Sequence, residues 1–339
     1  MNPGVLRVLA SRLMSALPIL FLVSVFLFVV LRLIPVDPLA MSLPPNATIE
    51  DVEQMRRDMG FDRPIHEQYG IWIAKAVRLD FGRSIHHRDE VSSLIGQTLP
   101  QTMELALVAI VIATVLGLAG GFYLFHVRGR KSETVVDFGS IVILSLPDFL
   151  WGLFLILLCG VAWEILPFNG RLAPEFTRPT VTGFLLLDTL LVGRLDMFID
   201  AVKHMVLPSL ALGISFSPAI MRVLRSSLID VYSEDYIQQA RLRGVGEVTI
   251  LLRHAAKNAI LPTLTLMGVQ FGFLFGGTLL IEVIFSYPGM GSLMVEAVRN
   301  ADLPLIQAVG LTYCIAVLLI NGVVDALYLV LNPRLRTAS

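Results

Sequence analysis

Six long apolar runs dominate this sequence and restrict what it can fold into. A helix that crosses a bilayer needs roughly 20 mostly apolar residues, and hydrocarbon admits only backbones whose polar groups are all hydrogen-bonded internally. The six runs that reach or approach this length lie at residues 13–31, 103–125, 138–163, 204–221, 259–281 and 305–331. The sequence therefore predicts an all-α polytopic membrane protein with six transmembrane helices.

The composition agrees with a membrane protein. Hydrophobic residues make up 55% of the 339 positions and charged residues only 16%, whereas soluble domains carry about a quarter charged residues. Cys159 and Cys314 both lie inside apolar runs, so we interpret them as small buried side chains rather than a disulfide or a metal site. The first run has no charge and no small-residue cleavage site after it, which indicates a retained signal anchor. A seventh run, 183–192, is too short to span and contains Asp188, which favours an interfacial or re-entrant piece.

The distribution of Lys and Arg indicates the orientation of the spans. With the N-terminus placed inside, the 26 basic residues divide equally between the two sides. The inside segments are shorter, however, so their density of positive charge is higher. We therefore expect both termini in the cytosol.

The chain divides into three parts. Residues 1–34 form the N-terminus and the first span, residues 35–99 form an extracytoplasmic helical cap, and residues 100–335 form a five-helix core that contains a polar cytosolic loop at 226–258. Within the cap, Thr48 is suited to N-cap a short helix over 48–59, and apolar spacing predicts a second helix over 65–79. The cap is either a solvated lid or a dock for an extracytoplasmic binding protein.

Two spans carry small residues one helical turn apart, which lets helix backbones approach closely in lipid. Plain packing is the simpler interpretation of these rows, and helices that line a path or slide are the alternative. The rows are Ala113, Gly117 and Gly121, and Gly268, Gly272 and Gly276.

Four acids, Glu104, Asp148, Glu282 and Asp325, lie within the apolar runs, where a charge is costly and usually faces a cavity or a partner. Glu104 and Glu282 are near the ends of their runs, so snorkelling to the interface or an error in the predicted boundary is the preferred interpretation for both. Asp148 follows Pro147, where a break in the helix favours a cavity.

The polar segment 233–262 separates two spans and reads as a short, well-capped helix. Ser233 is a good N-cap, and Glu234 and Asp235 place negative charge in the first turn. The residues Tyr236, Ile237 and Ala240 form an apolar stripe that we expect to face the cytosol, Arg241 and Arg243 end the helix, and Gly244 supplies a left-handed stop. A second helix is predicted over 247–258, with Pro262 opening the next span. The loop is either a knob that fits a cytosolic partner or a surface helix at the lipid headgroups.

The segment Asp235 to Pro262 resembles the coupling-loop signature of ABC importer permeases, and in particular the peptide and nickel group. The general signature reads EAA, three residues, Gly, nine residues and I-x-L-P. Here Gln238-Gln239-Ala240 replaces EAA, and His254, Ala256 and Lys257 stand where Ile, Leu and Pro are expected. The peptide-permease variant ARxxG followed by RHAxxNAxLP is present in full at 240–244 and 253–262.

Further stretches resemble the same family over most of the chain. They are IPVDP at 34–38, LDFGRS at 79–84, FSYPGMG at 285–291 and NPR at 332–334, and the segments 182–188 and 198–208 look most like dipeptide permeases. Val36, Tyr287 and Met290 depart from the usual Gly, Trp and Leu.

This resemblance implies a type I ABC importer permease in a bacterial inner membrane. A second homologous permease would complete the pathway, two cytosolic ATPases would bind the coupling loops, and an extracytoplasmic protein would deliver the solute. The chain contains no G-x-x-x-x-G-K-[ST] motif, so we expect no enzyme activity and no cofactor here, with ATP and Mg on the partners, and no nucleic acid. The residues that we expect to couple to the ATPases are Glu234, Tyr236, Ala240, Arg241, Gly244, Arg253 and His254. The candidates for the translocation path are Asp148, Gly272, Gly276 and Glu282.

Dipeptides or short oligopeptides are the favoured cargo, and nickel chelates, glutathione, haem precursors and antimicrobial peptides remain alternatives. An intramembrane hydrolase would need a G-x-S-x-G or H-E-x-x-H motif, and the sequence has neither. His86-His87 beside Arg88 is more simply a solvated loop pair than a metal site. A channel or a passive scaffold is the other rival, and the capped basic loop speaks against it.

Overall fold

The structure, a computed structural model, describes residues 3–33 and 63–331. The helix predicted over 48–59 and the motifs at 34–38 and 332–334 lie outside these ranges. Within them the chain is helical, with one isolated bridge between Arg83 and Glu90 and no strand. Five helices are long and apolar enough to cross a membrane, or six if one bent pair counts as a single span. The prediction of an all-α polytopic membrane protein is confirmed.

The helices in chain order are α1 (Pro3–Leu33), α3 (Ile65–Ala76), α4 (Val91–His126), α5 (Lys131–Ser145), α6 (Asp148–Leu155), α7 (Leu185–Leu191), α8 (Leu195–Tyr232), α9 (Asp235–Leu242), α10 (Glu247–Thr249), α11 (Ala256–Ile284), α12 (Met290–Arg299) and α13 (Leu303–Leu331). Two π-helical segments, Ile156–Ala162 and Ile250–Ala255, extend α6 and join α10 to α11. The predicted cap helix over 65–79 is present as α3 but ends at Ala76.

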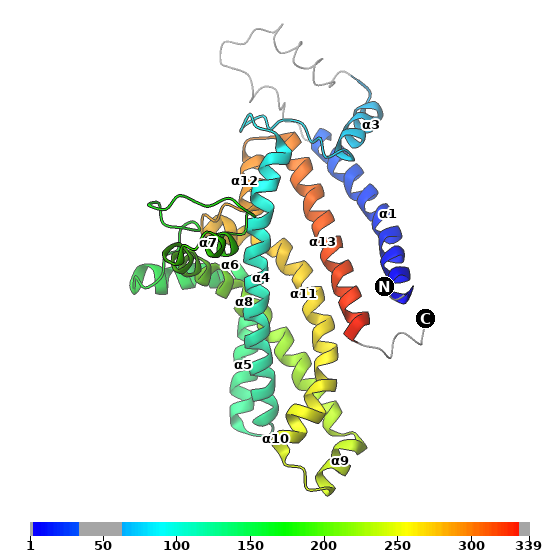
Figure 1. Ribbon diagram of the computed structural model, residues 1–339, viewed down its shortest axis with the longest axis vertical. Coiled ribbons are helices and arrows are strands. Elements are labelled where there is room, and N and C mark those ends of the chain that lie inside the picture. Colours follow the sequence, from blue (N-terminus) through cyan, green and yellow to red (C-terminus); the bar gives the residue numbers. More distant parts are fainter. Residues whose placement is uncertain (1–2, 34–62, 332–339) are drawn as a thin grey trace.

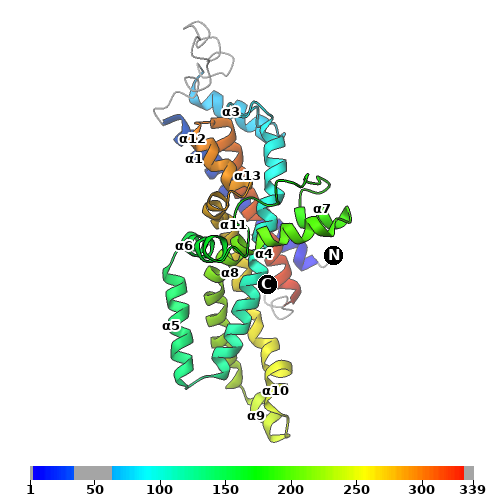
Figure 2. The ribbon, with the colours of Figure 1, turned by 90° about the vertical axis from the view of Figure 1, so that its left-hand side faces the viewer.

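The third predicted span is broken rather than continuous. Helix α5 and the helical stretch that begins with α6 meet at an angle of 101°. The cause is local, because Leu146 precedes Pro147 and has the extended conformation (φ −100°, ψ 131°) that a following proline imposes. In Figure 2, α5 runs beside the lower halves of α4 and α8, and α6 turns across the molecule.

The long helices α4 and α8 pack side by side at the centre of the molecule, and α11 lies against them (Figure 1). Their contact depends on small residues: a Cβ at Gly117 would lie 2.5 Å from Ile220, and one at Gly213 would lie 2.5 Å from Ile112. The row on α4 is therefore a packing surface, which was the simpler of the two interpretations. On α11, Gly268 likewise packs closely against Val324 of α13.

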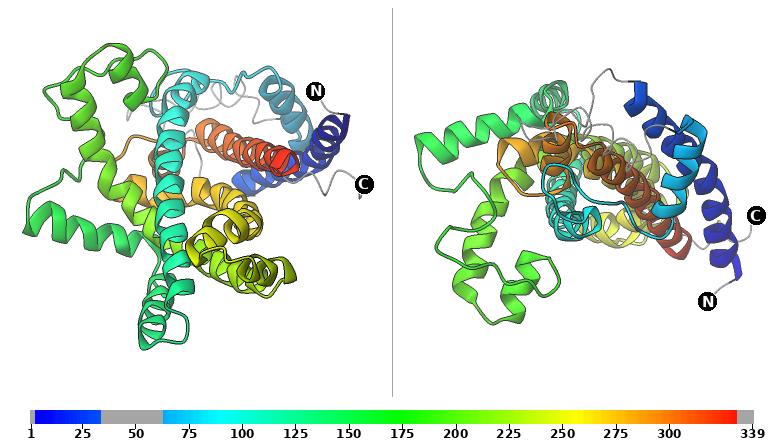
Figure 3. Two further views of the ribbon diagram at one scale, coloured as in Figure 1. Left: turned by 60° about the horizontal axis from the view of Figure 1, so that its bottom comes forward. Right: turned by 90° about the horizontal axis from the view of Figure 1, so that it is seen from above.

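Two peripheral parts flank the centre on opposite sides (Figure 3). On one side α1 contacts α13, and α3 folds back onto the upper end of α1, where the Tyr69 hydroxyl lies 2.8 Å from Ser24 Oγ. On the other side the segment between α6 and α8 carries α7, which has seven residues and is too short to span.

The Asp188 side chain of α7 organises the loop before it. This carboxylate is fully buried and accepts hydrogen bonds from the backbone N–H groups of Val181, Thr182 and Gly183 and from the Thr182 hydroxyl. Burial alone would raise the pKa of Asp188, but these hydrogen bonds outweigh it, and the pKa lies below its usual range. Asp188 is thus a structural anchor.

Candidate functional site

Helix α9 lies at the far lower end of the molecule, beyond the ends of α1 and α13 (Figure 1). It stands between the end of α8 and the start of the helix that continues into α11. Its inner side belongs to an apolar cluster in which Leu224 and Leu228 of α8, Ile250 and Ala259 are buried. The predicted loop helix is therefore present, and it packs against α8 and the helix that continues into α11.

The predicted start of α9 is wrong by one residue. Glu234 is the N-cap residue, and it makes no side-chain capping bond. The Ser233 hydroxyl instead donates to the backbone oxygen of Asp230, 2.6 Å away, and so closes the end of α8. Only two residues, Ser233 and Glu234, separate the end of α8 from the start of α9.

The predicted stop of α9 at Gly244 agrees with the structure. Gly244 has a φ of +76°, which costs an L-residue roughly 1–2 kcal/mol. The N–H of Gly244 donates to the Arg241 oxygen (2.9 Å) and the N–H of Val245 to the Ala240 oxygen (3.1 Å), the pair of bonds that defines a Schellman motif. A Cβ at Gly244 would meet no atom within 4 Å, so the backbone conformation alone requires glycine.

The apolar stripe of α9 faces the spans and not the cytosol, contrary to the sequence-based expectation. Ile237 is fully buried and Ala240 nearly so, whereas Tyr236, the third residue of the stripe, is 38% exposed. The exposed surface of α9 also includes Asp235, Gln238, Gln239 and Arg241, together with Leu242, which is 88% exposed. Two buried side chains, Ile237 and Ala240, thus pack this eight-residue helix against the apolar cluster.

Two polar contacts lock α9 to its neighbours. The Arg241 guanidinium donates to the Glu247 carboxylate at 2.6 and 3.3 Å and lies over the Tyr232 ring, 5.5 Å from its centroid. The Tyr236 hydroxyl accepts a hydrogen bond of 2.9 Å from the Asn258 side chain. These contacts join α9 to the end of α8 and to the start of α11, so α9 and both spans form one unit.

The second predicted helix does not end before the next span. The chain is helical without a break from Glu247 to Ile284 and passes through Pro262, whereas we had expected the loop helix to stop at 258. A π-helical segment at Ile250–Ala255 adjusts the first turns. Arg253 and His254 lie on this segment and are exposed. The polar segment after α9 is thus continuous with α11.

The structure corrects the interpretation of two of the intramembrane acids. Glu104 and Glu282 do not snorkel, because both are buried inside the protein. Glu104 pairs with buried Arg171 and accepts backbone hydrogen bonds from Leu185 and Leu186 at the start of α7. Sequence reasoning missed Arg171, which is 67 residues from its partner.

Glu282 lies in a closed network at the FSYPGMG motif. Its carboxylate accepts hydrogen bonds from the Thr102 hydroxyl (2.7 Å) and from the N–H groups of Gly291 (2.7 Å) and Ser292 (3.1 Å). A Cβ at Gly289 would lie 2.4 Å from this carboxylate, which explains one glycine of the motif. Its role in a path stays a prediction.

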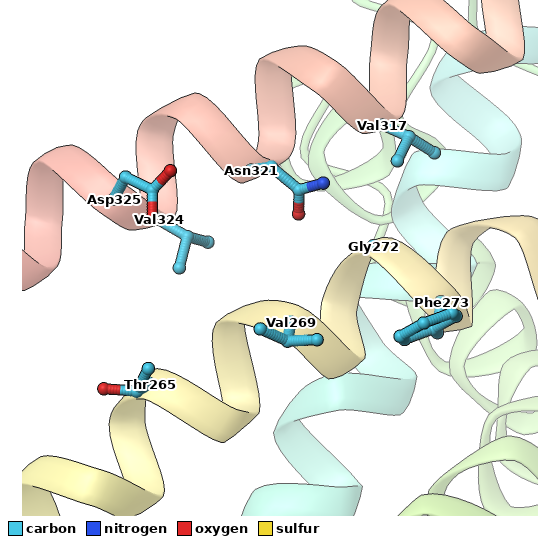
Figure 4. Close-up of a pocket in the computed structure, with 8 residues that line it drawn as sticks. All are labelled: Thr265, Val269, Gly272, Phe273, Val317, Asn321, Val324 and Asp325. Carbon is cyan, nitrogen blue, oxygen red and sulfur yellow. The ribbon is translucent and has the colours of Figure 1, made fainter. Parts of the chain in front are cut away.

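The other path candidates lie at three separate places. Gly272 lines a cavity of about 370 Å³ between α11 and α13 that also exposes Thr265, Asn321 and Asp325 (Figure 4). Gly276 lines an apolar cavity of about 430 Å³ between α1, α11 and α13. Asp148 begins α6 at the bend of the broken span.

The outer loop histidines converge on one carboxylate. His86 Nε2 and His87 Nε2 lie 3.4 and 3.6 Å from Glu296 of α12. Across residues 3–33 and 63–331 no group of His, Cys, Asp and Glu side chains is arranged to hold a metal ion.

Comparison with known proteins gives matches over nearly the whole chain. The family model "Binding-protein-dependent transport system inner membrane component" matches residues 113–337, and its N-terminal companion matches residues 5–106. The chain is 35% identical over 333 residues to the di/tripeptide transport system permease protein DppB of Pseudomonas aeruginosa (strain UCBPP-PA14), covering 98% of this chain and 99% of that protein. It is 34% identical over 331 residues, with the same coverage, to the glutathione transport system permease protein GsiC of Escherichia coli (strain K12).

A solved structure is similar in fold. It is a chain of the MetNI methionine ABC transporter in inward facing conformations, with a TM-score of 0.55 and 15% sequence identity, and the match covers 70% of this chain and 96% of that chain. At this identity the likeness bears on the fold alone.

Proposed function

Because this chain belongs to the family of inner membrane components of binding-protein-dependent transport systems, we propose that it imports dipeptides or short oligopeptides as one half of a translocation pathway. It is a multi-pass permease component of an ABC importer with a type I permease fold. The family membership that the sequence motifs indicated is confirmed. The proposed cargo rests on the di/tripeptide relative, and glutathione, which the second relative's name states, is the alternative.

We propose that α9 is the element to which a cytosolic ATPase subunit binds. One observation carries this proposal: α9 is held to α8 and α11 by its buried stripe and its two polar contacts, while its outer side is open. A helix held in this way moves together with α8 and α11 when an ATPase subunit displaces it. ATP is then hydrolysed by the partners, and this chain converts their movement into a movement of α8 and α11.

The remaining partners follow from the same proposal. A second homologous permease completes the pathway, two ATPases bind the paired coupling loops, and a solute-binding protein docks on the outer face, on the side of α3. Both chain ends and α9 then lie on the cytosolic side. The higher density of basic residues there supports this orientation.

Two substitutions in the coupling loop test the proposal. Gly244→Asp adds a Cβ and a negative charge at a φ of +76°, and Arg241→Glu replaces the ion pair with Glu247 by a repulsion. We expect both to abolish ATP-driven uptake of a peptide such as dialanine while the protein stays in the membrane. Gly246→Asp is the matched control, because it adds the same charge two residues away at an ordinary φ of −65° with no atom within 4 Å of a new Cβ. Normal uptake by both Gly244→Asp and Arg241→Glu would refute the coupling role.

A further inference from the structure

The bend of the broken span brings a carboxylate against the backbone of α11. Asp148 is the first residue of α6, and its Oδ1 accepts a hydrogen bond of 2.8 Å from the N–H of Phe149. Its other oxygen, Oδ2, lies only 3.5 Å from the position that a Cβ at Gly277 would occupy. A Cβ at 277 would thus be in ordinary van der Waals contact with the carboxylate, which places this carboxylate beside α11.

The surface around this carboxylate is open within the chain. Phe273 and Leu280 lie four residues before and three residues after Gly277, so they share its face of α11, and they are 71% and 47% exposed. Beside Asp148 itself, Leu146 and Leu150 are also exposed. Asp148 is therefore a single negative charge on an apolar, uncovered surface.

This charge has no counter-charge in the described part of the chain. The ion pairs found in residues 3–33 and 63–331 do not include Asp148. A carboxylate within a membrane protein's spans is expensive, and it usually faces a cavity or pairs with another group. Oδ1 of Asp148 accepts a hydrogen bond from the backbone N–H of Phe149, and Oδ2 lies beside the exposed apolar surface.

We propose that Asp148 binds the protonated amino group of the peptide as it passes this surface, an inference that rests on the proposed function. Dipeptides, tripeptides and glutathione differ in side chains but share a free amino group. Apolar contact is non-directional and tolerates varied side chains, whereas an ammonium donating to a carboxylate is a strong and directional contact. A single carboxylate on an apolar surface suits a cargo whose constant feature is one positive charge.

Two variants of Asp148 separate the effect of the side chain's charge from the effect of its shape. Both are measured in the full transporter with its second permease, ATPases and binding protein. Asp148→Asn keeps the shape and the oxygen that accepts from the N–H of Phe149 but removes the charge. Asp148→Glu keeps the charge. We expect Asp148→Asn to lower the initial rate of dialanine uptake at subsaturating peptide about tenfold or more, since a hydrogen bond to a charged group is lost, and Asp148→Glu to retain most of the rate. Ser145→Ala is the control at the same bend, because its hydroxyl bonds only within its own helix, to Ile141, and we expect wild-type uptake.

Three results would overturn the proposal. They are a wild-type rate for Asp148→Asn, an equal loss in Asp148→Glu, and a reduced amount of the second permease co-purifying with Asp148→Asn, which would assign the carboxylate to a subunit contact. A wild-type transporter that imports no dialanine would instead refute the proposed function, and this inference would fall with it.

Discussion

At the scale of single residues, Glu104 is a buried carboxylate inside a helix. Helix α4 begins 13 residues before it, at Val91. Its partner Arg171 comes from the loop after the broken span. A pairing between positions so far apart leaves no local pattern, whereas the capping role of Gly244 is local and was predicted.

The buried Glu104–Arg171 pair gives the first residue-scale prediction. Glu104→Gln leaves the Arg171 guanidinium, 4% exposed, without its counter-charge, and we expect a loss of about 3–5 kcal/mol in stability. Thermal unfolding of the purified protein in detergent measures this loss. The double variant Glu104→Gln with Arg171→Met removes both charges and should recover part of it. A single variant as stable as wild type would contradict the assignment.

A pair of glycines gives the second prediction at this scale. A Cβ at Gly291 would lie 2.5 Å from the Leu279 Cα, a backbone atom that cannot move aside, while a Cβ at Gly276 meets nothing within 4 Å. Gly291→Ala should therefore destabilise the protein by about 1–3 kcal/mol, and Gly276→Ala should not. The same unfolding assay compares them, and equal stabilities would refute the close packing at the FSYPGMG motif.

At the scale of elements, the apolar runs predicted the spans but not their ends. Helix α8 extends from Leu195 to Tyr232, well beyond the predicted 204–221, because its polar ends are held by tertiary contacts rather than by lipid. One such contact is the ion pair between Arg225 and Glu133 of α5. Pro147 indicated from the sequence that the span is broken there. No local residue pattern predicted the angle of 101° between its two halves. The direction of the α9 stripe was also missed, since an apolar stripe looks the same whether it faces a partner or its own spans.

The seating of α9 leads to a prediction for this element. Ile237→Ala opens a cavity in the cluster beneath α9, where Ile237 is fully buried, and should cost about 2–5 kcal/mol. Leu242→Ala, at 88% exposure, should leave stability unchanged but weaken binding of the ATPase subunits, measured by co-purification. If Leu242→Ala retains full binding and Ile237→Ala retains full stability, the two faces of α9 are assigned wrongly.

At the scale of the whole molecule, the orientation across the membrane is open to a direct test. We expect Val77, 78% exposed after α3, on the outer side and Gln239 of α9 in the cytosol. In a background with both native cysteines changed to serine, Val77→Cys should react with a membrane-impermeant maleimide in intact spheroplasts. Gln239→Cys should react only after permeabilisation, and the reverse pattern would invert the topology.

The chain also leaves much apolar surface uncovered, such as Leu17 and Leu22 of α1, at 67% and 65% exposure. Lipid or a second permease must cover such surface. The proposed ATPase contact concerns only one surface, the outer side of α9.

Site-specific cross-linking from Gln239 in the assembled transporter tests whether an ATPase subunit contacts the outer side of α9. A photoactivatable probe on Gln239→Cys should form an adduct with the ATPase subunit, and the same probe on Ile237→Cys, whose side chain faces the spans, should not. A transporter that imports peptide while the Gln239 probe captures only lipid would contradict the account.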